Sequence, residues 1–185
     1  MKRLSIMFLA LVLVFSTLIS GCNKTGNSSA ASGQTSGTSG SSDVIKIGVF
    51  EPITGANGAG GAMEVQGMQL ANKLYPEVLG KKVELVIVDN KSDKVEAANA
   101  VTRLIEKDKV TAIIGSWGSS LSMAAGPIAK SAKVPVVGAS CTNPNVTKGN
   151  EYYFRVCFID PFQGKVMANY AFSELKAKKA AIIQE

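Results

Sequence analysis

The 185-residue sequence contains no histidine. This absence excludes catalytic triads that depend on histidine and metal sites that need an imidazole ligand. Aromatic residues make up 6% of the chain, and its lysines and arginines, which give a net charge of +6, are interspersed with acidic residues. Because this spacing builds no basic face, nucleic acid is not among the expected partners. We predict no metal ion and no cofactor.

Cysteine is scarce, with three residues, and the first of them indicates where the protein works. Cys22 follows Ile19-Ser20-Gly21, at the end of an apolar run over residues 4–19 that begins after Lys2 and Arg3. A positive start, a short apolar run and small residues are typical of an export signal, and the run is too short for a stable membrane span. The alternative for Cys22 is an ordinary signal peptide with an incidental cysteine.

The position of Cys22 resembles the lipobox of bacterial lipoproteins. That resemblance implies cleavage before Cys22 and a diacylglycerol thioether on its sulfur. The protein is then expected to be exported and anchored by lipid to the extracytoplasmic face of the bacterial membrane, rather than to span it. The other two cysteines, Cys141 and Cys157, could pair in an exported compartment, but their spacing alone leaves the disulfide open.

Residues 23–42 consist almost wholly of Ser, Gly, Thr, Ala, Asn and Gln. With no large apolar residue to bury, such a segment cannot offset the entropy of ordering. We predict that it is a disordered tether, with a reach of roughly 25 Å, that follows the signal segment of residues 1–22.

From Val44 onward, short β-branched runs alternate with stretches of helical period, which predicts repeated strand–helix units. Such units form a doubly wound α/β fold, in which helices cover both faces of a parallel sheet. The helix over 94–108 is expected to bury Val95, Ala98, Val101, Leu104 and Ile105. The predicted strands are 44–50, 83–88, 110–114 and 134–137, and the predicted helices are 63–74, 94–108 and one from about 119 that is kinked or restarted at Gly126-Pro127.

Loops that follow the strands of such a sheet meet at one edge, where ligands bind. The first loop, over 54–61, is rich in glycine, but Gly58 and Gly60 are followed by Met63 where a dinucleotide fingerprint needs a third glycine. Asp89, at the end of the second strand, lies where a nucleotide-binding protein carries a ribose-binding acid, so nucleotide binding stays a weak alternative. The simpler alternative for this loop is a mobile surface turn.

The second loop, over 115–120, opens a helix, and its free N–H groups together with the hydroxyls of Ser119 and Ser120 suit a carboxylate. The alternative is that these serines are plain N-caps. A nucleophilic serine lacks a histidine base. The third loop, over 139–144, offers a further hydroxyl and carbonyls that could face an ammonium group, so the two loops together would fit a zwitterion.

In order and spacing, these segments resemble the branched-chain amino acid binding proteins, which are type I solute-binding proteins of ABC transporters. In that family two α/β lobes close over the ligand and deliver it to a membrane permease. The segments that carry the resemblance are Ile45 to Phe50, Thr54-Gly55, Gly67, Ile114-Gly115 with Ser119-Ser120, Val134 to Val137, Thr142-Asn143-Pro144, and Phe154-Arg155 leading to Asp160 and Gln163-Gly164.

The resemblance also implies roles for single residues. Ser119, with Ser120 beside it, corresponds to a serine that binds the ligand carboxylate, Ser140 to a carbonyl that takes the ammonium group, and Thr142 to a threonine that contacts both. Trp117 corresponds to a residue that lines the side-chain pocket, although a lone tryptophan can equally serve packing. Family members often carry an aromatic residue in the first loop where this chain has Gly60.

The resemblance divides the chain into lobe one over 43–159, and a hinge with the start of lobe two over 160–185, where residues 180–184 are expected to form a strand. The acidic partner of the ammonium group is expected beyond Glu185, and residues 23–185 alone are expected to be marginally stable. The predicted function is non-enzymatic capture of a branched-chain or other small amino acid, or a related carboxylate, for an ABC permease. The alternatives are a sensory ligand-binding module of the same fold and an exported enzyme.

Overall fold

The computed structural model describes residues 44–183. The predicted signal, Cys22 and tether lie outside the described residues. The elements are β1 (Ile45–Glu51), α2 (Gly58–Leu74), β2 (Glu77–Val78), β3 (Lys81–Asp89), α3 (Lys94–Glu106), β4 (Ala112–Ile114), α4 (Ser119–Ala132), β5 (Val136–Gly138), a short 3-10 helix (Pro144–Val146), β6 (Tyr153–Arg155) and α5 (Asp160–Ser173).

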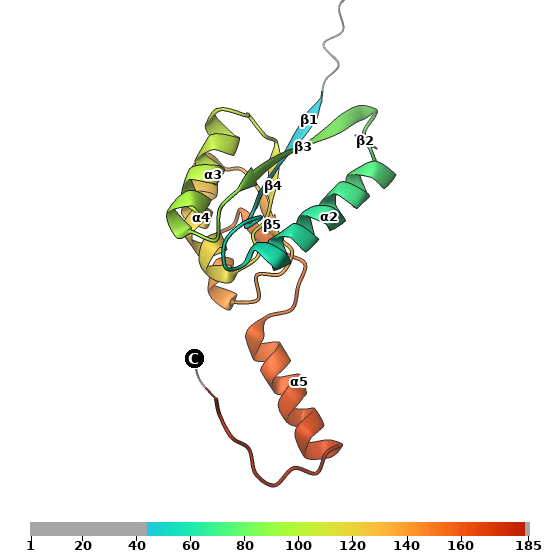
Figure 1. Cartoon of the computed structure of the whole chain (residues 1–185), viewed down its shortest axis with the longest axis vertical. Coiled ribbons are helices and arrows are strands. Elements are labelled where there is room, and N and C mark those ends of the chain that lie inside the picture. The colour runs from blue at the N-terminus through green and yellow to red at the C-terminus, as the bar shows by residue number, and fades with distance from the viewer. Residues whose placement is uncertain (1–43, 184–185) are drawn as a thin grey trace, which may run out of the picture. The chain divides into compact units, whose positions relative to one another are not determined.

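Within the described residues the strands form one sheet in the order β2-β3-β1-β4-β5-β6 (Figure 1). β3, β1, β4, β5 and β6 run parallel, and the short β2 is antiparallel to β3. In register, Val49 of β1 lies opposite both Ile87 and Ile114, and Ile114 lies opposite Val137. The carboxyl ends of the parallel strands therefore share one edge of the sheet, as the doubly wound fold predicts.

Helices cover both faces of the sheet, with α2 on one side and the packed pair α3 and α4 on the other (Figure 1). The alternation of β1 explains this arrangement, because successive side chains of a strand point to opposite faces. Ile45 and Ile47 lie toward α2. Phe50 belongs to the buried core with Leu104 of α3 and Leu121 of α4.

Three details of the predicted elements are corrected. The glycine-rich segment is not a mobile turn over its whole length, because α2 begins at Gly58 and buries Gly58, Gly60 and Gly61. Of the two alternatives for the helix from Ser119, the restart at Gly126-Pro127 is wrong, because α4 runs as one element through Pro127 to Ala132. Residues 180–183 form no strand, since no described strand offers them a partner.

The buried face of α3 was also predicted only in part. Its buried residues are Ala97, Ala100, Val101 and Leu104. Val95 is exposed, because at 3.6 residues per turn it lies about 120° around the helix from Val101. α5 buries none of its residues, and no helix within residues 44–183 is long and apolar enough to cross a membrane.

Candidate ligand-binding edge

The loops after β1, β4 and β5 meet at the carboxyl edge of the sheet. From β1 the chain passes to β3 on one side and then to β4 on the other, so the direction of winding reverses between β1 and β4. Such a switch point opens a crevice between the loops on its two sides, which is where open α/β sheets bind ligands. Because β4 lies beside β5, the loops predicted to hold the ligand are neighbours.

Asp89 fastens the first loop and is not free to bind a ribose. Its carboxylate accepts hydrogen bonds from the backbone N–H groups of Ile53 (2.9 Å), Thr54 (3.2 Å) and Lys91 (2.8 Å), and from the Thr54 hydroxyl at 2.6 Å. Burial acts to raise the pKa of Asp89, but these hydrogen bonds outweigh it and lower the pKa. The nucleotide case that rested on Asp89 is therefore wrong, since its acceptor sites serve the loop itself.

A buried polar network holds the second loop from below. Asn90 is fully buried, and its side-chain amide donates to the Phe50 carbonyl (3.3 Å) and to the Ser116 hydroxyl (2.9 Å). The Ser122 hydroxyl accepts from the Ser116 N–H at 3.2 Å, and the Tyr153 hydroxyl donates to the Gly115 carbonyl at 2.5 Å. Because buried polar networks specify position when their members are paired, the start of this loop is held in one arrangement.

Trp117 occupies the space that the first loop leaves open at Gly60. A Cβ added at Gly60 would lie 2.4 Å from the indole ring, so the ring rests directly on the glycine backbone. The backbone N–H of Trp117 donates to Glu51 Oε2 at 2.6 Å, and the residue is 37% exposed. The chain thus places an aromatic side chain at this point of the crevice from the second loop instead of the first.

This contact gives a direct test. Gly60→Ala should displace the indole ring and lower the free energy of unfolding by about 1–3 kcal/mol, because the new Cβ overpacks a filled space. Trp117 is the only tryptophan of the sequence, so its fluorescence emission should shift in the variant. Gly164→Ala, where a Cβ would meet nothing within 4 Å, is the control and should leave the emission unchanged. Unchanged emission in Gly60→Ala would contradict the contact.

The serines of the second loop do not cap α4. The N-cap is Gly118, with φ of 90° and no side-chain cap hydrogen bond, which corrects the N-cap alternative for Ser119 and Ser120. The Leu121 and Ser122 N–H groups bond back to the Gly118 carbonyl, at 3.0 and 3.3 Å. The N–H groups of the first helical turn that lack such a partner point out of the helix start, where they suit an anion.

Ser119 joins the second loop to the third. Its hydroxyl accepts a hydrogen bond from the Asn143 N–H at 3.2 Å, so the residue predicted for the carboxylate lies within reach of the loop predicted for the ammonium group. Ser120, the next residue, is exposed. Ser140 is half-buried, and its hydroxyl oxygen is buried without a hydrogen-bond partner. Thr142 is half-buried, and its carbonyl accepts from the Asp160 N–H at 3.0 Å.

Arg155 holds the shape of the third loop. Its guanidinium donates to the carbonyls of Cys141 (2.8 Å), Asn143 (2.9 Å) and Pro144 (3.3 Å), and to the Thr147 hydroxyl at 2.9 Å. Five donors on a rigid fork make arginine suited to such convergent carbonyls. The sequence identified Arg155 only as part of the Phe154-Arg155 motif. Its contacts with the third loop could not be inferred from that motif.

The two remaining cysteines do not form the disulfide that the sequence left open. Cys141 is buried and Cys157 half-buried, and both are free thiols. Burial raises the pKa of Cys141 to about 11, with a further rise from Cys157 nearby. Cys141 therefore packs as a neutral, buried thiol within the third loop.

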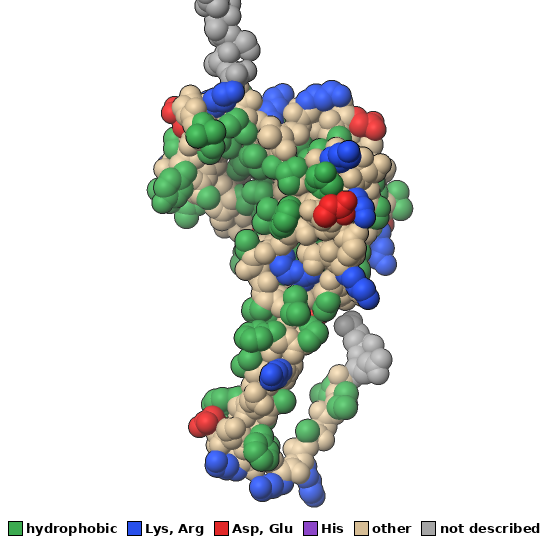
Figure 2. Space-filling view, turned by 180° about the vertical axis from the view of Figure 1, so that it is seen from behind, with side chains coloured by type: hydrophobic (Ala, Val, Ile, Leu, Met, Phe, Trp, Pro, Cys, Tyr) green, Lys and Arg blue, Asp and Glu red, His purple; other side chains and the backbone are tan. Residues whose placement is uncertain are grey.

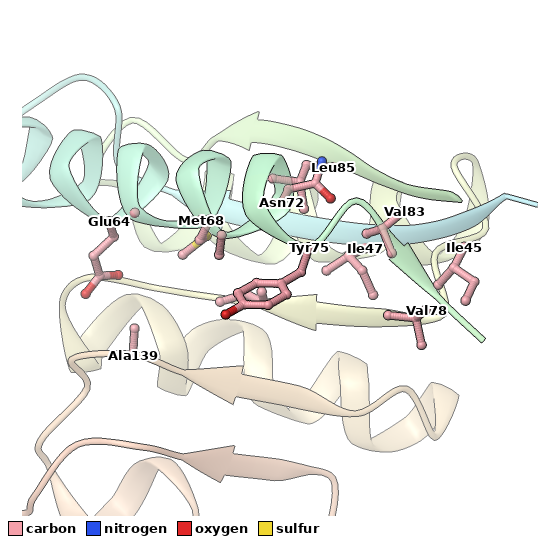
Figure 3. A pocket seen from close by; sticks show the side chains of 13 residues that line it. Ile45, Ile47, Glu64, Met68, Asn72, Tyr75, Val78, Val83, Leu85 and Ala139 are labelled. Carbon is pink, nitrogen blue, oxygen red and sulfur yellow. The ribbon is translucent and has the colours of Figure 1, made fainter. Parts of the chain in front are cut away.

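An apolar groove of about 630 Å³ runs between α2 and the sheet. Figure 3 shows Glu64 and Ala139 at one end of it, and Ile45 and Val78 at the other. Figure 2 shows hydrophobic side chains on the surface of the molecule. Leu70 and Leu74 of α2, and Tyr75 directly after it, are exposed.

Glu51 is the residue that the sequence analysis missed. It is the last residue of β1, is fully buried, and supports the Trp117 loop. The sequence did contain a hint of this role, because an acidic residue at the end of an apolar strand lies at the edge of the sheet where ligand-binding loops meet. Its partners come from distant parts of the chain, so the sequence alone could not assign it a role.

The sheet order, the helices on both faces and the polar loops at the switch point define a lobe of the type I periplasmic binding proteins. The chain belongs to this family, since the family profile described as periplasmic binding protein matches residues 44–185. Among its relatives, a Pseudomonas aeruginosa protein described as an amino acid binding protein is 35% identical over 147 residues, covering 77% of this chain and 39% of that protein.

Solved structures agree with this assignment. A leucine binding protein from Thermotoga maritima is 51% identical, with a TM-score of 0.69, and the match covers 72% of this chain and 38% of that one. A branched-chain amino acid transporter substrate binding protein from Streptococcus pneumoniae, in complex with isoleucine, is 39% identical, with a TM-score of 0.69 over 73% of this chain and 40% of that one. The chain thus spans about two fifths of the length of these relatives.

Proposed function

We propose that this chain forms lobe one of a lipid-anchored solute-binding protein that captures a branched-chain or other small amino acid for an ABC permease. The relatives support the class of ligand, since they include amino acid, leucine and isoleucine binders. The predicted export signal and the position of Cys22 after it support the proposed location on the extracytoplasmic face of the bacterial membrane.

The observation that carries the proposal is the junction of the loops after β4 and β5. The start of α4 offers N–H groups and the Ser119 hydroxyl to a carboxylate, and Ser119 reaches Asn143 of the next loop. Ser140 and Thr142 lie on that loop, where a carbonyl and a hydroxyl suit an ammonium group. A zwitterion fits both loops at once, with its side chain toward Trp117 and Gly60.

The proposed mechanism is closure of the two lobes over the ligand. A ligand held first by the loops of lobe one gains further contacts from lobe two only in the closed form, so it shifts the population toward closure. The closed form then docks on the permease. The sensory-module alternative would use the same closure with a different partner.

A thermal-shift screen tests the proposal. The full-length protein, purified from its native host, is heated with leucine, isoleucine, valine or alanine, and separately with a carboxylate that has no ammonium group. Amino acids should raise the melting temperature with a dependence on concentration that follows their Kd, and the simple carboxylate should raise it less. Stabilisation by none of the amino acids would contradict the proposed function.

The anchor has its own test. Cys22→Ser should yield a precursor that lacks the thioether lipid and no longer partitions with membranes, because the serine hydroxyl cannot provide the sulfur that carries the lipid. Mass spectrometry and membrane fractionation report both properties. Cys157→Ser is the matched control, since Cys157 is a free thiol far along the chain from the export signal, and it should leave the lipid in place. A lipidated Cys22→Ser protein would contradict the lipobox assignment.

A further inference from the structure

Trp117 lies in a loop whose own backbone does little to fix its position. It stands between Gly115 and Gly118, which adopt φ angles of 139° and 90°. Because glycine moves among many backbone conformations at little cost, such a segment has no preferred course of its own. Contacts with other parts of the chain therefore decide where the indole ring lies.

Both polar groups of the Trp117 backbone are bonded to buried side chains. The N–H donates to Glu51 Oε2 at 2.6 Å, and the carbonyl accepts from the Ser116 hydroxyl at 3.1 Å. The Ser116 hydroxyl in turn accepts from the side-chain amide of Asn90 at 2.9 Å. Glu51, Ser116 and Asn90 are fully buried, so water does not compete for these hydrogen bonds and they hold the backbone of Trp117 firmly.

The backbone of Trp117 connects two parts of the candidate site. Its indole ring rests on Gly60 of α2, on one side of the crevice. Ser119, which the proposed function assigns to the ligand carboxylate, follows two residues later at the start of α4. The position of the Trp117 backbone therefore sets how the ring lies relative to the point where the carboxylate is held.

We propose that Glu51, together with Ser116, is a positioning residue that fixes Trp117 as one wall of the ligand's side-chain pocket and thereby favours large apolar side chains over small ones. A ring held in one place packs against the side chain of leucine, whereas the methyl group of alanine offers few atoms for such contacts. Releasing the ring thus costs leucine more than alanine. The preference for leucine rests on the proposed function, whereas the hold of Glu51 on Trp117 does not.

The hold on Trp117 is tested without ligand, by two substitutions of Glu51. Glu51→Ala removes the acceptor, whereas the glutamine carbonyl of Glu51→Gln can still accept from the Trp117 N–H. Burial raises the pKa of Glu51 to about 9, so the uncharged glutamine is a close substitute at pH 7. The Trp117 N–H should exchange with deuterium about tenfold faster, or more, in Glu51→Ala than in the parent, and at the parent's rate in Glu51→Gln. Nuclear magnetic resonance of the amide signals measures these rates.

The Ile113 N–H reports whether the sheet itself is intact. It donates to the Pro135 carbonyl at 2.9 Å and should stay protected in all variants. Glu84→Ala, at an exposed position of β3, is the control and should exchange like the parent. Parental protection of the Trp117 N–H in Glu51→Ala would overturn the proposal. If Glu51→Ala does not fold, Ser116→Ala removes the donor to the Trp117 carbonyl instead, and it should shift the preference for leucine in the same direction.

Calorimetry with leucine and with alanine separates positioning from general damage. In Glu51→Ala the Kd for leucine should rise about fivefold or more and the Kd for alanine less than about twofold, and Glu51→Gln should keep both values. An equal rise for the two amino acids would indicate a merely structural role and overturn the proposal. If neither amino acid binds the parent while the Trp117 N–H responds as expected, the proposed function fails together with the preference, and the hold of Glu51 on Trp117 stands.

Discussion

Gly61→Ala should lower the free energy of unfolding by about 2–3 kcal/mol, because the new methyl group would clash with a buried backbone. A Cβ at Gly61 would lie 2.1 Å from the Pro52 carbonyl oxygen and 2.8 Å from two further atoms of that residue. Pro52 is itself fully buried, so neither backbone can move aside without disturbing β1. The cost of overpacking exceeds the gain of about 1 kcal/mol that alanine brings to a helix. Urea unfolding measures the difference.

Gly67→Ala is the matched control in the same helix. A Cβ there would meet nothing within 4 Å, so only helix propensity changes and stability should rise by about 1 kcal/mol. The two substitutions are chemically identical and differ only in what faces the new methyl group. Equal stability of the two variants would show that α2 does not lie against Pro52 as described.

Ser119→Ala and Thr142→Ala should each weaken the binding of the amino acid by about 1–3 kcal/mol, or about 5- to 150-fold in Kd. In the proposed site, each variant removes a hydroxyl assigned to a charged group of the ligand, and leaving that charge without its partner lowers the affinity. Isothermal titration calorimetry on the full-length protein measures the change in Kd.

Ser131→Ala provides the control for these variants, because Ser131 is exposed near the far end of α4. Its affinity and melting temperature should match those of the parent. Ser119 also accepts from the Asn143 N–H, so its variant is heated in parallel to separate loss of stability from loss of binding. Unchanged affinity in both Ser119→Ala and Thr142→Ala would remove these residues from the site.

The sequence predicted the edge of the sheet at which the candidate site lies, but not the hydrogen bonds that hold its loops in place. The β-branched runs predicted strands that end at Ile114 and Val137, and in the structure these strands end at Ile114 and Gly138, so the two loops that follow them could be placed at one edge. Which groups hold those loops could not be read in the same way. Asp89 and Arg155 form hydrogen bonds with loops that precede them by up to 36 residues in sequence. No local sequence pattern indicates contacts between residues so far apart.

The glycine-rich segment shows the same limit within a secondary-structure element. Glycine weakens a helix, so a run of four residues with three glycines favoured a turn. The tertiary structure overrides that preference, because the first turn of α2 packs against Pro52 and Trp117, where only glycine leaves room for the backbone. The intrinsic cost of glycine is smaller than the cost of the clash that any other residue would bring.

The sequence by itself determined the alternation of strands and helices and the doubly wound class, and it predicted the export signal. These features depend on periodicity and composition over short stretches of chain. Only the tertiary structure decided which residues support the crevice: the indole of Trp117 on Gly60, the guanidinium of Arg155 on the third loop, and the buried carboxyl group of Glu51 on the Trp117 backbone. These contacts join residues that are distant in sequence, and their energies depend on burial and on distances that exist only after the chain has folded.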